Sequence, residues 1–184
     1  MGERSKDREA RLEALFQRHY RDVALYVRRR ADADLVEDVA AETFLVAWRR
    51  LDDIPTNARP WLLGVARKTL STHRRSAGRR RSLVTKLEAE ASSVWSEQAN
   101  ESRVAEALMR LSAKDREAIT LVAWEGLRPS EAAVVVGQSP MAFRVRLHRA
   151  KRRLREQLGA SVEAADGEHS VSPREIPLTG GPGR

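Results

Sequence analysis

A run of basic residues close to the C-terminus has side chains suited to binding a nucleic-acid duplex. Arginine can donate two hydrogen bonds to guanine in the major groove, and both arginine and lysine neutralise phosphates. No acidic residue occurs between Glu131 and Glu156, whereas seven Arg or Lys fall between residues 144 and 155. Because a solvated helix face normally mixes charges of both signs, this run indicates an anionic partner. The alternative is a basic amphipathic helix that only packs and aids solubility.

The elements that must position this run have the spacing of a helix-turn-helix. We predict a short helix from Ser130 to Val136, a three-residue turn that contains Gly137, and a long helix from Pro140 to about Leu158. Apolar residues at intervals of four, three and four mark the buried side of the long helix. The other side carries the residues expected to contact bases or phosphates: Arg144, Val145, His148, Arg149, Lys151, Arg152, Arg153 and Arg155.

A second basic surface is predicted on a helix that begins near Pro60 and ends before Gly78. No acidic residue occurs from Ile54 to Leu87. The helical period gathers several basic side chains opposite the apolar ones, so this surface is separate from the first. A solvated helix end with an adjoining linker would have the same composition and remains the alternative. The basic residues of the predicted helix are Arg67, Lys68, Arg74 and Arg75.

The helix predicted from about residue 33 to residue 48 has an acidic outer face. Glu37, Asp38 and Glu42 lie on it, and the last two are one helical turn apart. An acidic face does not help a basic chain to bind nucleic acid, but it can bind a basic protein surface. An ordinary solvated helix face is the alternative.

Composition limits the function further. The chain has 184 residues, a formal net charge of +8 and no cysteine, which excludes disulfides, thiolate zinc sites and cysteine nucleophiles. Its four histidines show no spacing typical of a metal site or a catalytic pair, and no glycine-rich phosphate loop is present, so we expect no enzyme, metal or cofactor. With no run of about 18 apolar residues and no signal peptide, we expect no membrane insertion and a cytoplasmic location.

The pattern of helix formers and breakers predicts an all-α protein of two small helical domains joined by a flexible linker. Residues 8–80 form the first domain, 81–102 the linker, 103–158 the second domain and 159–184 a disordered tail rich in Gly and Pro. Ser112 is expected to cap a helix of the second domain that stops at Gly126. Trp95 in the linker has no assigned role.

Three segments together resemble the extracytoplasmic-function sigma factors of bacterial RNA polymerase, in the order that this family has. Residues 38–45 (DVAAETFL) resemble the region-two helix that docks on the polymerase clamp. Residues 59–68 (RPWLLGVARK) resemble the segment that opens the minus-ten element, and residues 143–151 (FRVRLHRAK) resemble the region-four recognition helix for the minus-thirty-five element. The chain departs from the family pattern at Ala41, Lys68 and Val145, where Gln, Asn and Ser are common.

The resemblance implies a promoter-specificity factor that binds core RNA polymerase and promoter DNA and helps to melt the minus-ten element. The residues implied in polymerase binding are Asp38, Ala41, Glu42 and Phe44. The residues implied in minus-ten binding are Asn57, Trp61, Arg67, Lys68, Arg74 and Arg75. Asn57 could equally be a turn residue, and helical neighbours on all sides favour Trp61 as a core residue. Val145 could contact a thymine methyl, and Lys68 suits a phosphate.

The family also implies an anti-sigma factor as a further partner. Two alternatives of other kinds stay open: a stand-alone helix-turn-helix regulator, and an interaction protein for which DNA contact is secondary. The two basic surfaces with an acidic helix favour the sigma factor, because the stand-alone regulator needs no acidic helix. The promoters and the inducing signal are not encoded in these patterns.

Overall fold

The computed structural model describes residues 2–82 and 103–167, and the described residues contain no strand. The predicted all-α fold is therefore confirmed for these residues. Their elements are α1 (Gly2–Arg28), α2 (Leu35–Arg49), the 3-10 turn η1 (Leu51–Asp53), α3 (Ala58–Ser82), α4 (Arg103–Arg110), α5 (Ala113–Ala123), α6 (Pro129–Val136) and α7 (Pro140–Gly167).

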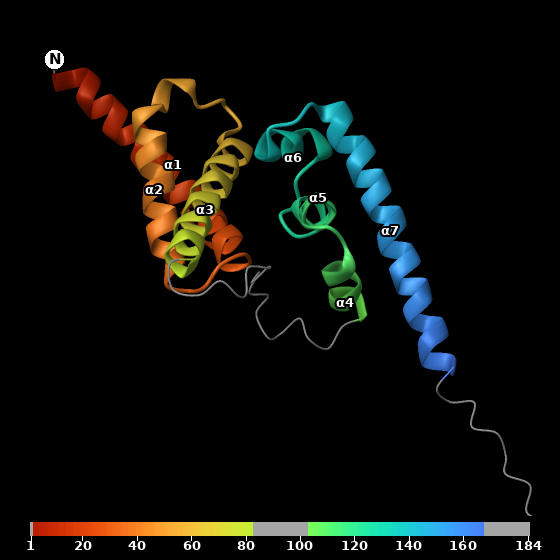
Figure 1. The fold of residues 1–184 in the computed structure, drawn as a ribbon. Helices are drawn as coiled ribbons and strands as arrows, with labels where there is room; N and C mark the ends of the chain where they lie inside the picture. The colour runs from red at the N-terminus through yellow and green to blue at the C-terminus, as the bar shows by residue number, and fades with distance from the viewer. Residues whose placement is uncertain (1, 83–102, 168–184) are drawn as a thin grey trace, which may run out of the picture.

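The N-terminal helices α1, α2 and α3 pack against one another as a three-helix unit (Figure 1). Each helix contributes apolar residues three and four apart, so one stripe of each faces a common core. Fully buried side chains of this core are Val23, Tyr26, Val39, Ala47, Leu62 and Leu63. The packing leaves the acidic face of α2 and the C-terminal half of α3 on the outside of the unit.

The C-terminal helices α4, α5 and α6 pack against the long helix α7. Phe143, Leu147 and Ala150 of the predicted stripe are buried, and its fourth residue, Leu154, is partly buried and packs against the same core. The turn before α7 depends on Gly137, whose φ of 67° is left-handed and whose N–H contacts the carbonyls of the last turn of α6. This arrangement is a helix-turn-helix.

The two units contact each other mainly through α3 and α6, and α6 lies between α3 and α7 (Figure 1). Gly64 makes the contact close, because a Cβ built on it would lie 3.4 Å from the carbonyl oxygen of Val135. A larger side chain would push the two helices apart. The sequence patterns predicted both units, but they contained no sign of this contact.

Two predicted helix ends are wrong. Helix α3 continues through Gly78 to Ser82, and α7 continues past Leu158 to Gly167, so the disordered tail predicted from residue 159 is helical over its first nine residues. A single glycine costs a helix about 1 kcal/mol, which the good helix formers around it can offset. The predicted linker was residues 81–102; its first two residues belong to α3, and residues 83–102, with Trp95, lie outside the described residues, as does the tail from residue 168.

The N-cap of α5 is set by a side chain. The hydroxyl of Ser112 accepts a hydrogen bond of 3.2 Å from the backbone N–H of Asp115, as the sequence predicted. We expect Ser112→Ala to lower the free energy of unfolding by about 1 kcal/mol, because one N–H of the first turn loses its acceptor. Chemical denaturation measures this, and Ser112→Asp is the control that should retain most of the stability. An equal loss in both variants would contradict the capping role.

The first turn of α6 is held by Glu131. Its carboxylate accepts 2.8 Å hydrogen bonds from the backbone and the guanidinium of Arg128. These bonds to Arg128, together with one from Asn57, lower the pKa of Glu131 from 4.5 to about 2.

This shift predicts a pH dependence of stability. Because the pKa of Glu131 is lowered by folding, its contribution is present above about pH 4.5 and is lost as the pH falls towards 2. The melting temperature of Glu131→Gln should therefore lie below that of the wild type at pH 6, and the gap should close between pH 5 and 2. Glu106→Gln, an exposed position on α4, is the charge-matched control. A gap that stays constant across this range would refute the assignment.

Candidate nucleic-acid and protein interfaces

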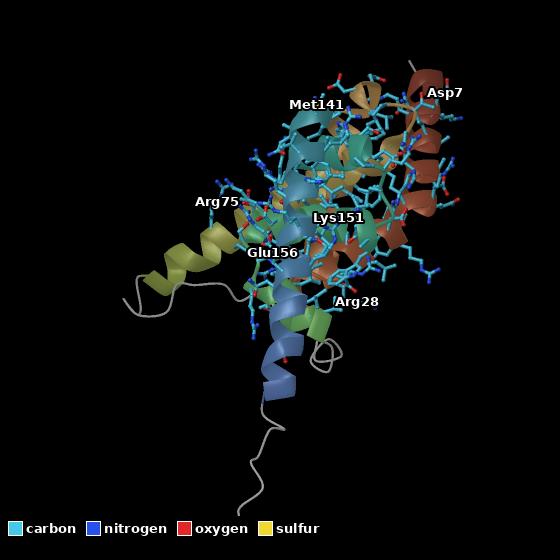
Figure 2. The ribbon with its side chains drawn as sticks, turned by 90° about the vertical axis from the view of Figure 1, so that its right-hand side faces the viewer. Asp7, Arg28, Arg75, Met141, Lys151 and Glu156 are labelled. Atoms are coloured by element: carbon cyan, nitrogen blue, oxygen red, sulfur yellow. The ribbon has the colours of Figure 1, made fainter. Side chains whose placement is uncertain are left out.

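The face of α7 that was predicted to bind duplex DNA is exposed. Figure 2 views the molecule from the side of α7, with Met141 near the start of the helix and Lys151 further along it. The residues predicted on this face are all exposed. They are Arg144, Val145, His148, Arg149, Lys151 and Arg152. Some of them make contacts within α7, such as the bond that Arg144 donates to the backbone carbonyl of Pro140. Met141, 65% exposed, adds an apolar side chain that the sequence analysis did not single out.

Arg153 has a different role from the one predicted. Its guanidinium pairs with the carboxylate of Asp115, whose side chain is only 8% exposed. A carboxylate so far out of water needs a compensating charge, so this pair ties α7 to α5. Arg153 therefore helps to position the exposed face of α7 and is not a free phosphate ligand.

Helix α2 presents an acidic stripe. Asp38, Ala41 and Glu42 are exposed, and Leu45 continues the stripe at 54% exposure. These positions are three or four apart and so lie on one face. Glu42 also accepts a 2.9 Å contact from the imidazole of His73 on α3, which sequence spacing could not reveal.

Phe44 does not belong to that exposed stripe. It is 6% exposed, and its ring packs against Phe16 on α1, with 4.9 Å between the ring centroids, and against Tyr20. The prediction that Phe44 contacts polymerase is therefore corrected: Phe44 is a core residue that supports the stripe from beneath. Phe16 is itself 43% exposed.

The predicted minus-ten residues fall into two groups. Lys68 and Arg75 are exposed, and Arg75 lies at the edge of the molecule in Figure 2. Trp61 is half-buried and packs on the core, with the guanidinium of Arg50 5.9 Å from its ring centroid. Arg74 is exposed but donates a hydrogen bond to the carbonyl of Arg30. These four residues belong to the N-terminal unit alone.

Asn57 and Arg67 form the second group, because carboxylates of the C-terminal unit already bind them. The amide of Asn57 donates to Glu131 at 2.9 Å. The guanidinium of Arg67 donates two hydrogen bonds to Glu117, at 2.7 and 2.9 Å. This bond to Glu117 also raises the pKa of Arg67. Asn57 is therefore more than a turn residue in this structure.

Glu125 is the most buried of these carboxylates. Its side chain is 2% exposed and accepts hydrogen bonds of 2.8 Å from Arg29 and Arg30, which directly follow α1. Arg30 also lies over the ring of Tyr26, 3.8 Å from its centroid, and burial raises the pKa of Tyr26 to about 12. Arg59 on α3 donates to the backbone carbonyl of Glu125 at 2.8 Å. Sequence reasoning missed Glu125, because a single Glu before a glycine has no distinctive pattern.

The described part of the chain holds no group of three His, Cys, Asp or Glu side chains that could bind a metal ion. Within the same residues, every helix is too short or too polar to cross a membrane.

Comparison with known proteins agrees with this arrangement. The family profile of Sigma-70 region 2 matches residues 15–80, the N-terminal unit, and that of Sigma-70, region 4 matches residues 101–154. The ECF RNA polymerase sigma factor SigL of Mycobacterium tuberculosis is 33% identical over 165 residues, which cover 83% of this chain and 93% of SigL.

Two further relatives are matched over very different shares of their own length. The probable RNA polymerase sigma factor RfaY of Xanthomonas campestris is 35% identical over 148 residues, which are 74% of this chain but only 36% of RfaY. The solved structure of the sigma factor RpoE with the anti-sigma factor NepR, from Bartonella quintana, superposes with a TM-score of 0.52 at 25% identity and covers 86% of this chain and 98% of RpoE. From the two matching regions in their order, and from the near full-length similarity to SigL, the chain belongs to the extracytoplasmic-function sigma factors, the factors that direct transcription initiation at specific promoters.

Proposed function

We propose that this chain recruits core RNA polymerase to its promoters by dividing the work among three helices. Helix α7 reads the minus-thirty-five duplex, α3 binds the melted minus-ten strand, and the stripe on α2 holds polymerase. The observation that carries the proposal is that one chain exposes a cationic face on a helix-turn-helix and an acidic stripe on a different unit. A protein that bound DNA alone would have no use for the acidic stripe.

For α7, the proposed contacts follow from side-chain chemistry. Arg144 and Arg149 are exposed arginines that can pair with guanine edges, and the exposed side chain of Val145 suits a thymine methyl. Lys151 and Arg152 lie further along the helix and would neutralise phosphates, which sets the position of the helix on the duplex without reading its sequence.

For α3, the proposed action is capture of a strand that is already unpaired. Removing a base from the stack costs a few kcal/mol, and a surface that binds only the open form shifts the equilibrium towards melted DNA. Lys68 and Arg75 are accessible for phosphates, and Asn57 could read a base edge once it is released from Glu131. No covalent bond is made or broken in this scheme, so the chain acts as a binding factor and not as an enzyme.

For α2, the proposed partner is a basic surface of core polymerase. Asp38 and Glu42 supply charge, and the exposed side chains of Ala41 and Leu45 supply an apolar contact between them. An interface of this kind gains specificity from charge complementarity and affinity from the apolar centre. Binding to polymerase also places the chain in the cytoplasm.

An anti-sigma factor is a further proposed partner. RpoE of Bartonella quintana, which this chain resembles over most of its length, was solved in complex with the anti-sigma factor NepR. Which surface such a partner would cover in this chain is a separate question from the division of labour among the helices.

The first test reverses charge on α7. We expect Arg144→Glu with Arg149→Glu to lower run-off transcription at least tenfold from a promoter identified by mapping transcript starts after overexpression, since each good arginine–guanine pair is worth about 1–3 kcal/mol. Pull-down of core polymerase should be unchanged. Equal loss of both activities would count against separate surfaces.

The second test reverses charge on α2. We expect Asp38→Arg with Glu42→Arg to abolish pull-down of core polymerase, because two attractive contacts become repulsive. Binding of a minus-thirty-five duplex by the variant, measured by fluorescence anisotropy, should be at least as tight as that of the wild type. Asp7→Arg with Glu106→Arg, at exposed positions on α1 and α4, is the control, because it raises the net charge by the same amount. If the variant retained polymerase as well as this control does, the stripe would not be the docking site.

A further inference from the structure

We infer that the free chain closes on itself and thereby engages two of its minus-ten donors, Asn57 and Arg67, with carboxylates of the C-terminal unit in the place of nucleic acid. The inference rests on the proposed role of α3 and adds a regulation of that same surface. Asn57 and Arg67, which were implied in minus-ten binding, contact Glu131 and Glu117 of the other unit.

The contacts are ones that a nucleic-acid strand could replace. The planar guanidinium of Arg67 presents two parallel donors to Glu117, and the same fork fits a phosphate equally well. Those two donors cannot serve a carboxylate and a phosphate together. The amide of Asn57 is likewise committed to Glu131. Closure and capture of a single strand therefore compete for the same atoms.

Glu125 makes the closed form cooperative. Its carboxylate is almost fully buried and depends on Arg29 and Arg30 of the N-terminal unit for compensation. Separating the units must return all three charged groups to water in one step, together with the Arg59 contact to the Glu125 carbonyl. The closed form is held by these charged and polar groups together with the apolar packing of α3 on α6 around Gly64, and raised salt should weaken the partly exposed pairs, such as Arg67 with Glu117.

Closure affects only part of the surfaces that are proposed to bind partners. The cationic face of α7, the acidic stripe of α2, and Lys68 and Arg75 on α3 all remain exposed in the closed form. The closed chain can still bind a duplex and polymerase. The donors of Asn57 and Arg67, however, already bind carboxylates of the other unit. We therefore expect closure to weaken single-strand capture specifically.

The closed form is measured by energy transfer between the units. The chain has no cysteine, so Ala14→Cys on α1 and Ala113→Cys on α5, both exposed, give two unique labelling sites. Glu117→Arg should lower the transfer efficiency, the swap Arg67→Glu with Glu117→Arg should restore it, and Glu106→Arg should leave it unchanged. Glu125→Gln is a second opening variant that retains side-chain shape. Transfer that is unchanged in both opening variants overturns the closed form.

Competition with nucleic acid is measured by anisotropy with a fluorescent single-stranded oligonucleotide. If the closed form holds about nine molecules in ten, opening raises the apparent affinity about tenfold. Glu117→Gln and Glu125→Gln should show this rise and Glu106→Gln should not, although all three remove one negative charge. Equal affinities in the three variants overturn the shared use of the donors. The affinity for a minus-thirty-five duplex should change by the same factor in all three variants.

A separate variant distinguishes this inference from the proposed function. Lys68→Glu with Arg75→Glu lies outside the contacts between the units and should lower run-off transcription while leaving energy transfer unchanged. Normal transcription by this variant would overturn the minus-ten role of α3, and with it the regulation of that role. The energy-transfer result would still decide whether the free chain is closed.

Discussion

The carboxylate of Glu125 depends on two arginines from another part of the chain, and the arrangement of the molecule depends on that pairing. A charge removed from water is tolerated only where opposite charge and hydrogen bonds replace the water. Arg29 and Arg30 supply both, and Arg59 secures the adjacent backbone. This constraint fixes α1 and α3 against the end of α5, and so decides which faces of the two units meet and which stay exposed.

Each unit has a simpler basis. Apolar stripes on α1, α2 and α3 and those on α5, α6 and α7 are buried in one continuous cluster, which the contact between α3 and α6 joins. The charged surfaces are what remains on the outside once those stripes are buried. An ion pair between the buried carboxylate of Asp115 and the half-exposed guanidinium of Arg153 joins α7 to α5. Arg153, which has a structural partner, thus lies on the same helix as the arginines that we propose bind DNA.

The exposed surfaces differ in whether residues of the other unit already bind them. The face of α7 and the stripe on α2 have no partner in the other unit among the contacts described, whereas part of α3 is bound to Glu117 and Glu131. Arginine and asparagine donors on α3 accept carboxylates and phosphates alike. A chain whose acidic and basic residues can satisfy one another has a built-in competitor for its own ligand, and the ionic strength sets how strong that competitor is.

The sequence by itself determined the helices, the helix-turn-helix, the exposed side of α7 and the acidic side of α2. These properties follow from local spacing, because a helix of 3.6 residues per turn maps residue positions directly onto faces. Only the tertiary structure decided that Phe44 is buried, that Arg153 pairs with Asp115, and that Asn57 and Arg67 bind carboxylates from the other unit. Such contacts join residues 38 to 74 positions apart, or depend on what packs over a helix, and the periodicity of one helix carries no information about which charge of another will approach it.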